Sequence, residues 1–141
     1  GKAEAVQAAG EACKEAGAKR VVPLKVSGPF HSKMLTGAGE ELKKVLDTVK
    51  INTPSVPYVA NVNASYVDSD SEIAALLTQQ ISSPVKFMQS VEKMIEDGVD
   101  TFIEIGPGKT LSSFVKKINR DVNVINIQTP QDLEKLGGLQ C

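Results

Sequence analysis

The sequence has few of the residues from which metal centres and disulfide frameworks are built. Its 141 residues include two cysteines, one histidine and no tryptophan. Cys13 and Cys141 stand far apart and form no Cys-x-x-Cys pair, so the pattern indicates neither a zinc site nor a disulfide scaffold. We therefore expect two free thiols and no bound metal.

The sequence also lacks an excess of either charge and any long apolar run. Its 16 Lys and Arg residues nearly balance its 17 Asp and Glu residues, so no strong field would attract nucleic acid or an acidic membrane surface. No apolar run approaches the ~18 residues of a membrane span, and the opening residues lack the pattern of a signal peptide. These absences predict a cytoplasmic protein without a nucleic-acid or membrane partner.

What the sequence has is an apolar content of 41%, enough for one ordinary core. Apolar residues recur with helical spacing in some segments and form short β-branched runs in others. The predicted helices cover residues 3–16, 34–49, 70–81, 84–97, 111–118 and a short segment after Thr129-Pro130. The predicted strands cover residues 20–26, 56–62, 101–105 and 122–127. Strands that alternate with helices favour an α/β fold with parallel pairing.

The run IGPGKT at 105–110 joins a predicted strand to a predicted helix, as a phosphate-binding loop does. A Walker motif requires a glycine where this chain has Ile103, and the dinucleotide-binding motif requires one where it has Leu111. We therefore interpret the run as a tight turn in which Gly106 and Gly108 supply positive φ angles or close backbone approach, not as a nucleotide site.

The only histidine, His31, lies in the run VSGPFHSKML, directly after a Gly-Pro turn. Ser32 is predicted to cap the following helix, so His31 should stand at a helix N-terminus, where the macrodipole disfavours a charged imidazolium. A neutral ring at the edge of a cleft is what a general base requires. The alternative is a solvated or hydrogen-bonded histidine without a catalytic role.

A general base needs a nucleophile, and the sequence offers none in a recognisable setting. Ser27, Ser32 and Cys13 are candidates by residue type only, because Ser32 is expected to cap a helix and Cys13 to face a core. No Gly-x-Ser-x-Gly elbow occurs anywhere in the sequence. The residues alone therefore predict a general base without a nucleophile in the same sequence.

Four runs, in this order, resemble the carboxyl-terminal portion of the malonyl-CoA:acyl carrier protein transacylases: VSGPFHSKML, VPYVANVNA, TQQISSPVKF and FIEIGPGKTLSSFVKKI. The resemblance spans Gly1 to Leu136. It implies part of an α/β-hydrolase-like parallel sheet with helices for residues 27–136. Residues 1–26 would be the last helix and strand of a ferredoxin-like small subdomain, and residues 137–141 are interpreted as a tail of artificial origin.

The resemblance also implies a function. Family members move malonyl from coenzyme A to the phosphopantetheine thiol of acyl carrier protein in fatty acid synthesis. They use a Ser-His ping-pong mechanism with no cofactor beyond the coenzyme A thioester substrate. His31 matches the catalytic base, and Gln80 matches the residue near which a backbone carbonyl orients that imidazole. Phe30 matches a substrate-binding position that favours malonyl over methyl-branched malonyl, with a packing role as its alternative.

The chain departs from the family pattern because the nucleophilic serine and the arginine that binds the malonyl carboxylate would lie before Gly1. Arg20 and Arg120 do not match that arginine. The expected partners are malonyl-CoA, acyl carrier protein and the missing amino-terminal half, and the isolated chain should be almost inactive. A non-catalytic fragment or interaction module that binds the amino-terminal half or acyl carrier protein remains the alternative, and a serine hydrolase of similar topology is a third.

Overall fold

The computed structural model describes residues 1–138, so the last three residues of the predicted tail 137–141 lie outside the described residues. Helices and short strands alternate along the chain, as the sequence predicts. Their order is α1 (Ala3–Glu15), the 3-10 helix η1 (Lys33–Leu35), α2 (Thr36–Leu46), β1 (Val59–Ala60), β2 (Ser65–Tyr66), α3 (Asp70–Ser82), α4 (Phe87–Glu96), β3 (Thr101–Ile105), α5 (Thr110–Ile118), β4 (Asn123–Ile127) and the 3-10 helix η2 (Pro130–Leu136).

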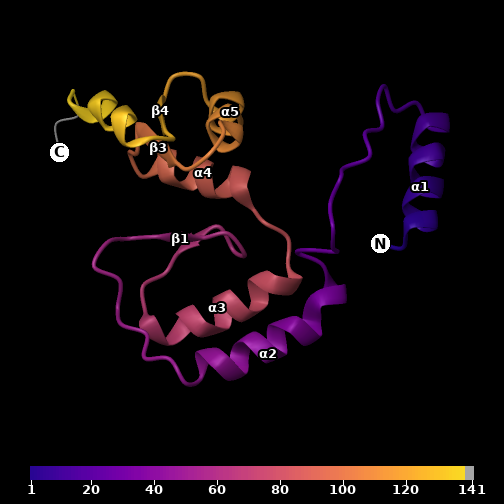
Figure 1. The fold of residues 1–141 in the computed structure, drawn as a ribbon, viewed down its shortest axis with the longest axis horizontal. Coiled ribbons are helices and arrows are strands. Elements are labelled where there is room, and N and C mark those ends of the chain that lie inside the picture. The colour runs from indigo at the N-terminus through magenta and orange to yellow at the C-terminus, as the bar shows by residue number, and fades with distance from the viewer. Residues whose placement is uncertain (139–141) are drawn as a thin grey trace.

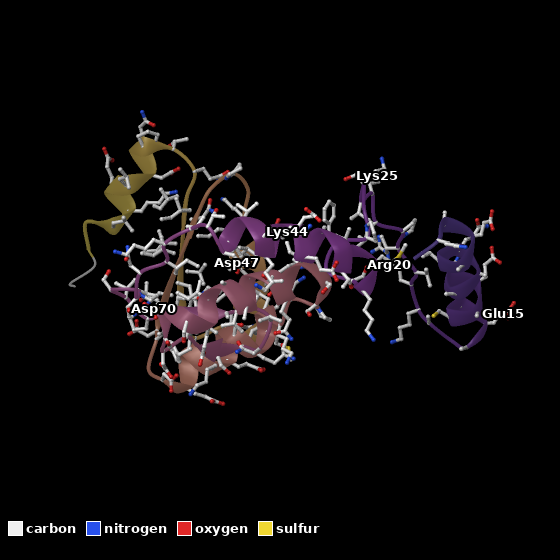
Figure 2. All side chains as sticks on the ribbon, turned by 90° about the horizontal axis from the view of Figure 1, so that it is seen from below. Glu15, Arg20, Lys25, Lys44, Asp47 and Asp70 are labelled. Carbon is white, nitrogen blue, oxygen red and sulfur yellow. The ribbon has the colours of Figure 1, made fainter. Side chains whose placement is uncertain are left out.

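The elements gather in three parts (Figure 1). Helix α1 stands apart at one end, and a long connection without regular structure leads from it to the rest of the chain. Helices α2 and α3 lie side by side below the β1–β2 hairpin, while α4, β3, α5, β4 and η2 form the third part. Figure 2 shows the same separation from below, with Glu15, Arg20 and Lys25 on the side of α1.

Strands β3 and β4 pair in parallel, with Thr101 opposite Asn123 and Ile105 opposite Ile127. Helix α5 connects them, so this is the strand-helix-strand unit that the alternating pattern predicts. Its core consists of the buried Val91, Val115 and Val122, against which apolar residues of α4, α5 and both strands pack. The predicted α/β class and parallel pairing are confirmed.

A second small core lies under the β1–β2 hairpin. The antiparallel strands pair Val59 with Tyr66 and Ala60 with Ser65. The buried residues of this core are Ala60, Val62, Val67 and Ile73. Because Ile73 belongs to α3, this core packs the start of that helix against the β1–β2 hairpin. Ser69 caps the helix, since its hydroxyl oxygen accepts a hydrogen bond from the Ser71 N–H at 3.2 Å.

Helices α2 and α3 pack so closely that one position admits only glycine without displacement. Gly39 is buried in α2, and a Cβ atom added there would lie 3.1 Å from the main-chain oxygen of Thr78 in α3. A contact this short is tighter than most Cβ contacts in proteins, so the α3 backbone would have to give way by a few tenths of an ångström. The contact lies near the end of α3 that carries Gln80.

The strand predicted at 20–26 is wrong for the described structure. This segment has no strand pairing, and its apolar residues Val22, Leu24 and Val26 are all exposed. A β-strand requires hydrogen bonds to a second strand, and none of residues 1–138 supplies one to this segment. The assignment of residues 1–26 to a separate small subdomain stays a prediction.

Three other boundaries differ from the predictions. Helix α2 begins at Thr36 after a 3-10 turn and ends at Leu46, before the predicted end at 49. The strand predicted at 56–62 is reduced to β1. Helix α4 begins at Phe87, three residues after the predicted start at residue 84, and Lys86 is its N-cap. Ser83 is instead the C-cap of α3, and the Lys86 N–H donates a hydrogen bond to Asn61 O at 2.8 Å. Of the helices that the structure describes, none has the length and apolarity needed to cross a membrane.

The close approach of α2 and α3 predicts opposite consequences for two glycines of the same helix. Gly37→Ala should raise the free energy of unfolding by about 0.5–1 kcal/mol, because its Cβ would enter open space and alanine favours the helix. Gly39→Ala should be less stable than Gly37→Ala by about 1 kcal/mol or more, because the α3 backbone must shift. Denaturant unfolding followed by circular dichroism measures the free energy of unfolding of both variants. Equal stabilities of the two variants would contradict the close contact at Gly39.

Candidate active site

His31 lies in a tight turn just before η1, and its backbone has a φ of 58°. The left-handed region is uncommon for residues other than glycine and costs about 1–2 kcal/mol. The turn is closed by Ser32, whose hydroxyl donates a hydrogen bond to the main-chain oxygen of Pro29 at 2.7 Å. The backbone at His31 is therefore held in a conformation that it would not adopt by itself.

The imidazole of His31 contacts the end of α3. Its Nδ1 lies 3.0 Å from the main-chain oxygen of Gln80. That oxygen belongs to the last turn of the helix, where Pro84, four residues on, has no N–H to donate. Its main-chain partner is the Ser83 N–H at 3.4 Å, which leaves the oxygen able to accept a second hydrogen bond from a side chain. Because a carbonyl oxygen only accepts, the neutral ring must carry its proton on Nδ1, and the unprotonated Nε2 can accept a proton.

The side-chain amide of Gln80 has a different role from its main-chain carbonyl. Its Nε2 donates to Ser83 O at 3.1 Å and to Pro84 O at 3.4 Å, and it also lies 3.4 Å from His31 Nδ1. In the Nδ1–H tautomer both of those nitrogens are donors, so the carbonyl is the partner of the ring and the amide is not. The amide instead binds the loop that follows α3. The structure thus places the two residues predicted for the site in contact.

Phe30, the third predicted site residue, precedes His31 and is 63% exposed. Its ring lies over Gly28, where an added Cβ would come within 3.2 Å of the ring edge. The ring is therefore not part of either described core.

The candidate nucleophiles do not occupy their predicted places. Ser32 makes no side-chain cap to η1, because its hydroxyl is directed back to Pro29, and the predicted cap is wrong. Cys13 is exposed on α1 and does not face a core. Neither residue is brought to His31 by a hydrogen bond in the described residues.

A carboxylate to which the sequence patterns assign no role organises the carboxyl end of β3. Glu104 accepts hydrogen bonds from the N–H groups of Leu111 and Ser112 at 3.1 and 2.9 Å, and from the Ser112 hydroxyl. The Ser112 hydroxyl, followed by its N–H, holds the pKa of the Glu104 carboxyl below its usual range. An acidic residue inside an otherwise apolar strand was the signal for this function, because such a residue requires partners.

The glycine turn between β3 and α5 has the conformation that the sequence predicts. Gly106 and Gly108 have φ angles of 138° and 90°. The turn is held from β4, where Asn126 Nδ2 donates to Gly108 O at 2.8 Å, and from Gln128, whose side-chain oxygen accepts from Gly108 N at 2.9 Å. The positive φ angles predicted for the two glycines are confirmed.

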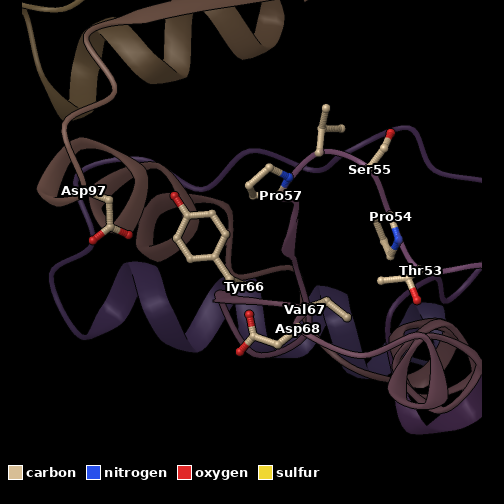
Figure 3. A pocket seen from close by; sticks show the side chains of 9 residues that line it. Thr53, Pro54, Ser55, Pro57, Tyr66, Val67, Asp68 and Asp97 are labelled. Atoms are coloured by element: carbon tan, nitrogen blue, oxygen red, sulfur yellow. The ribbon is translucent and has the colours of Figure 1, made fainter.

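A shallow open hollow of about 660 Å³ lies elsewhere, between residues 53–57 and β2. Figure 3 shows Tyr66 and Asp97 on one side of it and Thr53 and Pro54 on the other. His31 is not among its lining residues, so the hollow is separate from the histidine site. Within residues 1–138, no three His, Cys, Asp or Glu side chains come together in a way that could hold a metal ion.

An imidazole that is fixed in one tautomer by its Nδ1, and whose Nε2 engages no other group of residues 1–138, has the geometry of a proton-transferring group in hydrolases and transferases. Comparison with known sequences specifies the class. Residues 1–131 match the acyl transferase domain, and the chain belongs to that family.

Its relatives include the malonyl CoA-acyl carrier protein transacylase of Bacillus subtilis, 48% identical over 95% of this chain and 42% of the relative. The chain is also similar to the crystal structure of MCAT from Streptococcus pneumoniae, with a TM-score of 0.90, 43% identity, and coverage of 96% of this chain and 44% of the other. A malonyl-transacylase in complex with a type II PKS acyl-carrier protein has a TM-score of 0.89 and 36% identity, over 96% and 44% of the two chains. The chain spans about two fifths of the length of these proteins.

Glu104→Gln should lower the thermal unfolding temperature at neutral pH, because the amide binds the N–H groups of α5 less strongly than the carboxylate does. Since folding lowers the pKa of Glu104 below 4.5, its contribution is present above about pH 4.5 and is lost as the pH falls through the folded pKa. The difference between wild type and variant should therefore shrink as the pH is lowered from neutrality to below about 4.5. The same exchange at the exposed Glu92 of α4 is the control, and a constant difference across this range would contradict the role of the carboxylate.

Proposed function

We propose that this chain is the carboxyl-terminal part of a malonyl CoA-acyl carrier protein transacylase and supplies its general base. One observation carries the proposal: the 3.0 Å contact from His31 Nδ1 to the main-chain oxygen of Gln80. The family membership and the names of the relatives at 43–48% identity support the choice of reaction. The substrates are then a coenzyme A thioester and acyl carrier protein, and no resident cofactor is required.

The proposed reaction proceeds in two transfers through His31. A serine hydroxyl attacks the malonyl thioester carbonyl while Nε2 of His31 takes its proton, and the imidazolium returns that proton to the departing thiolate of coenzyme A. The malonyl group is then esterified to the serine. In the second transfer Nε2 takes the proton of the phosphopantetheine thiol, the thiolate attacks the ester, and the serine oxygen recovers its proton from the ring.

Gln80 O has the same function in both transfers. It accepts the Nδ1–H bond, which keeps Nε2 directed away from α3 and stabilises the positive charge that the ring acquires. We infer that the serine and the group that binds the malonyl carboxylate come from the amino-terminal part of the protein. Ser32 cannot act as this serine without breaking its hydrogen bond to Pro29.

The role of His31 can be tested in a hybrid protein. The amino-terminal part of the Bacillus subtilis relative, up to its match with this chain, would precede Gly1. His31→Ala in this hybrid should lower the rate of malonyl transfer by at least about a hundredfold, in line with the loss of a general base. The rate is measured as radiolabelled malonyl transferred from coenzyme A to acyl carrier protein.

Three outcomes would count against the proposal. Near-normal malonyl transfer by the His31→Ala hybrid would show that His31 is not the general base. A folded hybrid that does not transfer malonyl with His31 intact would favour the non-catalytic interaction module. Release of free malonate in place of transfer would favour a hydrolase.

We further propose that Phe30 limits the size of the acyl group, since it directly precedes His31 and its ring is exposed at the turn. Phe30→Ser should raise the kcat/KM for methylmalonyl-CoA relative to malonyl-CoA by about tenfold or more, because space for one methyl group is worth 1–3 kcal/mol. Competition between the two thioesters in the hybrid measures this ratio directly. The same exchange at the exposed Phe114 of α5 is the control, and an unchanged ratio in Phe30→Ser would leave Phe30 as a packing residue.

A further inference from the structure

The turn that carries His31 combines an unfavourable backbone with one side-chain bond that closes it. His31 is one of only two non-glycine residues with positive φ among residues 1–138, the other being Ala64 in the β1–β2 hairpin. Residues held in such conformations occur at functional sites, where the surrounding contacts maintain them. The contact that closes this turn is the 2.7 Å bond from the half-buried Ser32 hydroxyl to Pro29 O.

The bond joins the two residues that flank Phe30 and His31. It therefore limits the φ and ψ angles of both residues between its ends. The second attachment of the turn is the imidazole itself, through Nδ1 and Gln80 O. Without the Ser32 bond, His31 could relax toward the more favourable region with negative φ, and that rotation would carry the ring away from α3.

We propose that Ser32 is a positioning residue for His31, which acts by holding the left-handed turn that directs Nδ1 at Gln80 O. This inference rests on the proposed function, because it assigns Ser32 to the same proton transfer. Ser32 does not touch the substrate or move a proton in this scheme. Its hydroxyl donates a hydrogen bond to Pro29 O, and this bond affects the reaction only because it holds the imidazole in its orientation.

The structure offers a control with the same kind of bond. The Thr48 hydroxyl donates to Val45 O, three residues back, at 2.8 Å, near the other end of α2. Thr48→Ala removes a hydroxyl-to-carbonyl bond of equal span without altering the histidine turn. Ser32→Thr keeps the hydroxyl and is the variant expected to restore activity.

The kinetic test uses the hybrid described above. Ser32→Ala should lower kcat by about fivefold to tenfold, as the loss of one such hydrogen bond predicts, with little change in the KM for malonyl-CoA. Ser32→Thr should recover most of the lost rate, and Thr48→Ala should retain it. Added to His31→Ala, the Ser32→Ala exchange should cause no further loss, because a residue that acts only through the imidazole has no effect once the imidazole is gone.

A readout that does not depend on activity separates this inference from the proposed function. In the hybrid labelled with 15N-histidine, Nδ1 of His31 should give the 15N resonance of a protonated ring nitrogen, which His31→Ala assigns by its disappearance. Ser32→Ala should broaden or shift that resonance, and Thr48→Ala should leave it in place. If the hybrid transfers no malonyl at all, the proposed function fails while this measurement still decides the role of Ser32.

Two results would overturn the inference. An unchanged Nδ1 resonance together with unchanged kcat in Ser32→Ala would show that the turn does not need its hydroxyl bond. An equal loss of rate in the presence and absence of His31 would show that Ser32 acts independently of the ring.

Discussion

The distance between α2 and α3 is the constraint on which the candidate site depends. Gly39 lets the helices meet with no side chain between the α2 backbone and Thr78 O. Gln80 lies two residues beyond Thr78, and the turn of His31 immediately precedes the helical residues at the start of α2. The two groups that form the contact between imidazole and carbonyl are attached to these two helices, so the contact depends on how α2 and α3 pack.

The chain uses carbonyl and carboxylate groups differently at two helix ends. At the C-terminus of α3, the main-chain carbonyl of Gln80 accepts a hydrogen bond from the imidazole as well as a longer one, of 3.4 Å, from the Ser83 N–H, and it fixes the tautomer without adding a full negative charge beside the ring. At the N-terminus of α5, the full charge of Glu104 meets free N–H groups and the positive end of the helix dipole. The carbonyl at the end of α3 thus binds a hydrogen-bond donor, and the N–H groups at the start of α5 bind an acceptor.

Sequence patterns predicted secondary structure well where it depends on residues that are neighbours in the sequence. Helical spacing predicted α1, α3 and α5, and the Val- and Ile-rich runs predicted β3 and β4 with parallel pairing. They failed for residues 20–26, because a β-branched run becomes a strand only when another strand supplies hydrogen bonds. They also placed the start of α4 too early, since the Lys86 N–H is bound by Asn61 of the hairpin.

The sequence by itself determined the helices, the parallel pair of strands and the glycine turn, and through its motifs it singled out His31, Gln80 and Phe30. Spacing along the chain is sufficient for these because each depends on neighbouring residues or on a specific run of residues. Only the tertiary structure decided that Ser32 binds Pro29, that Cys13 is exposed, and that the Gln80 amide binds Ser83 O and Pro84 O. A hydroxyl, thiol or amide can satisfy many partners, and which one it meets depends on how segments distant in sequence pack.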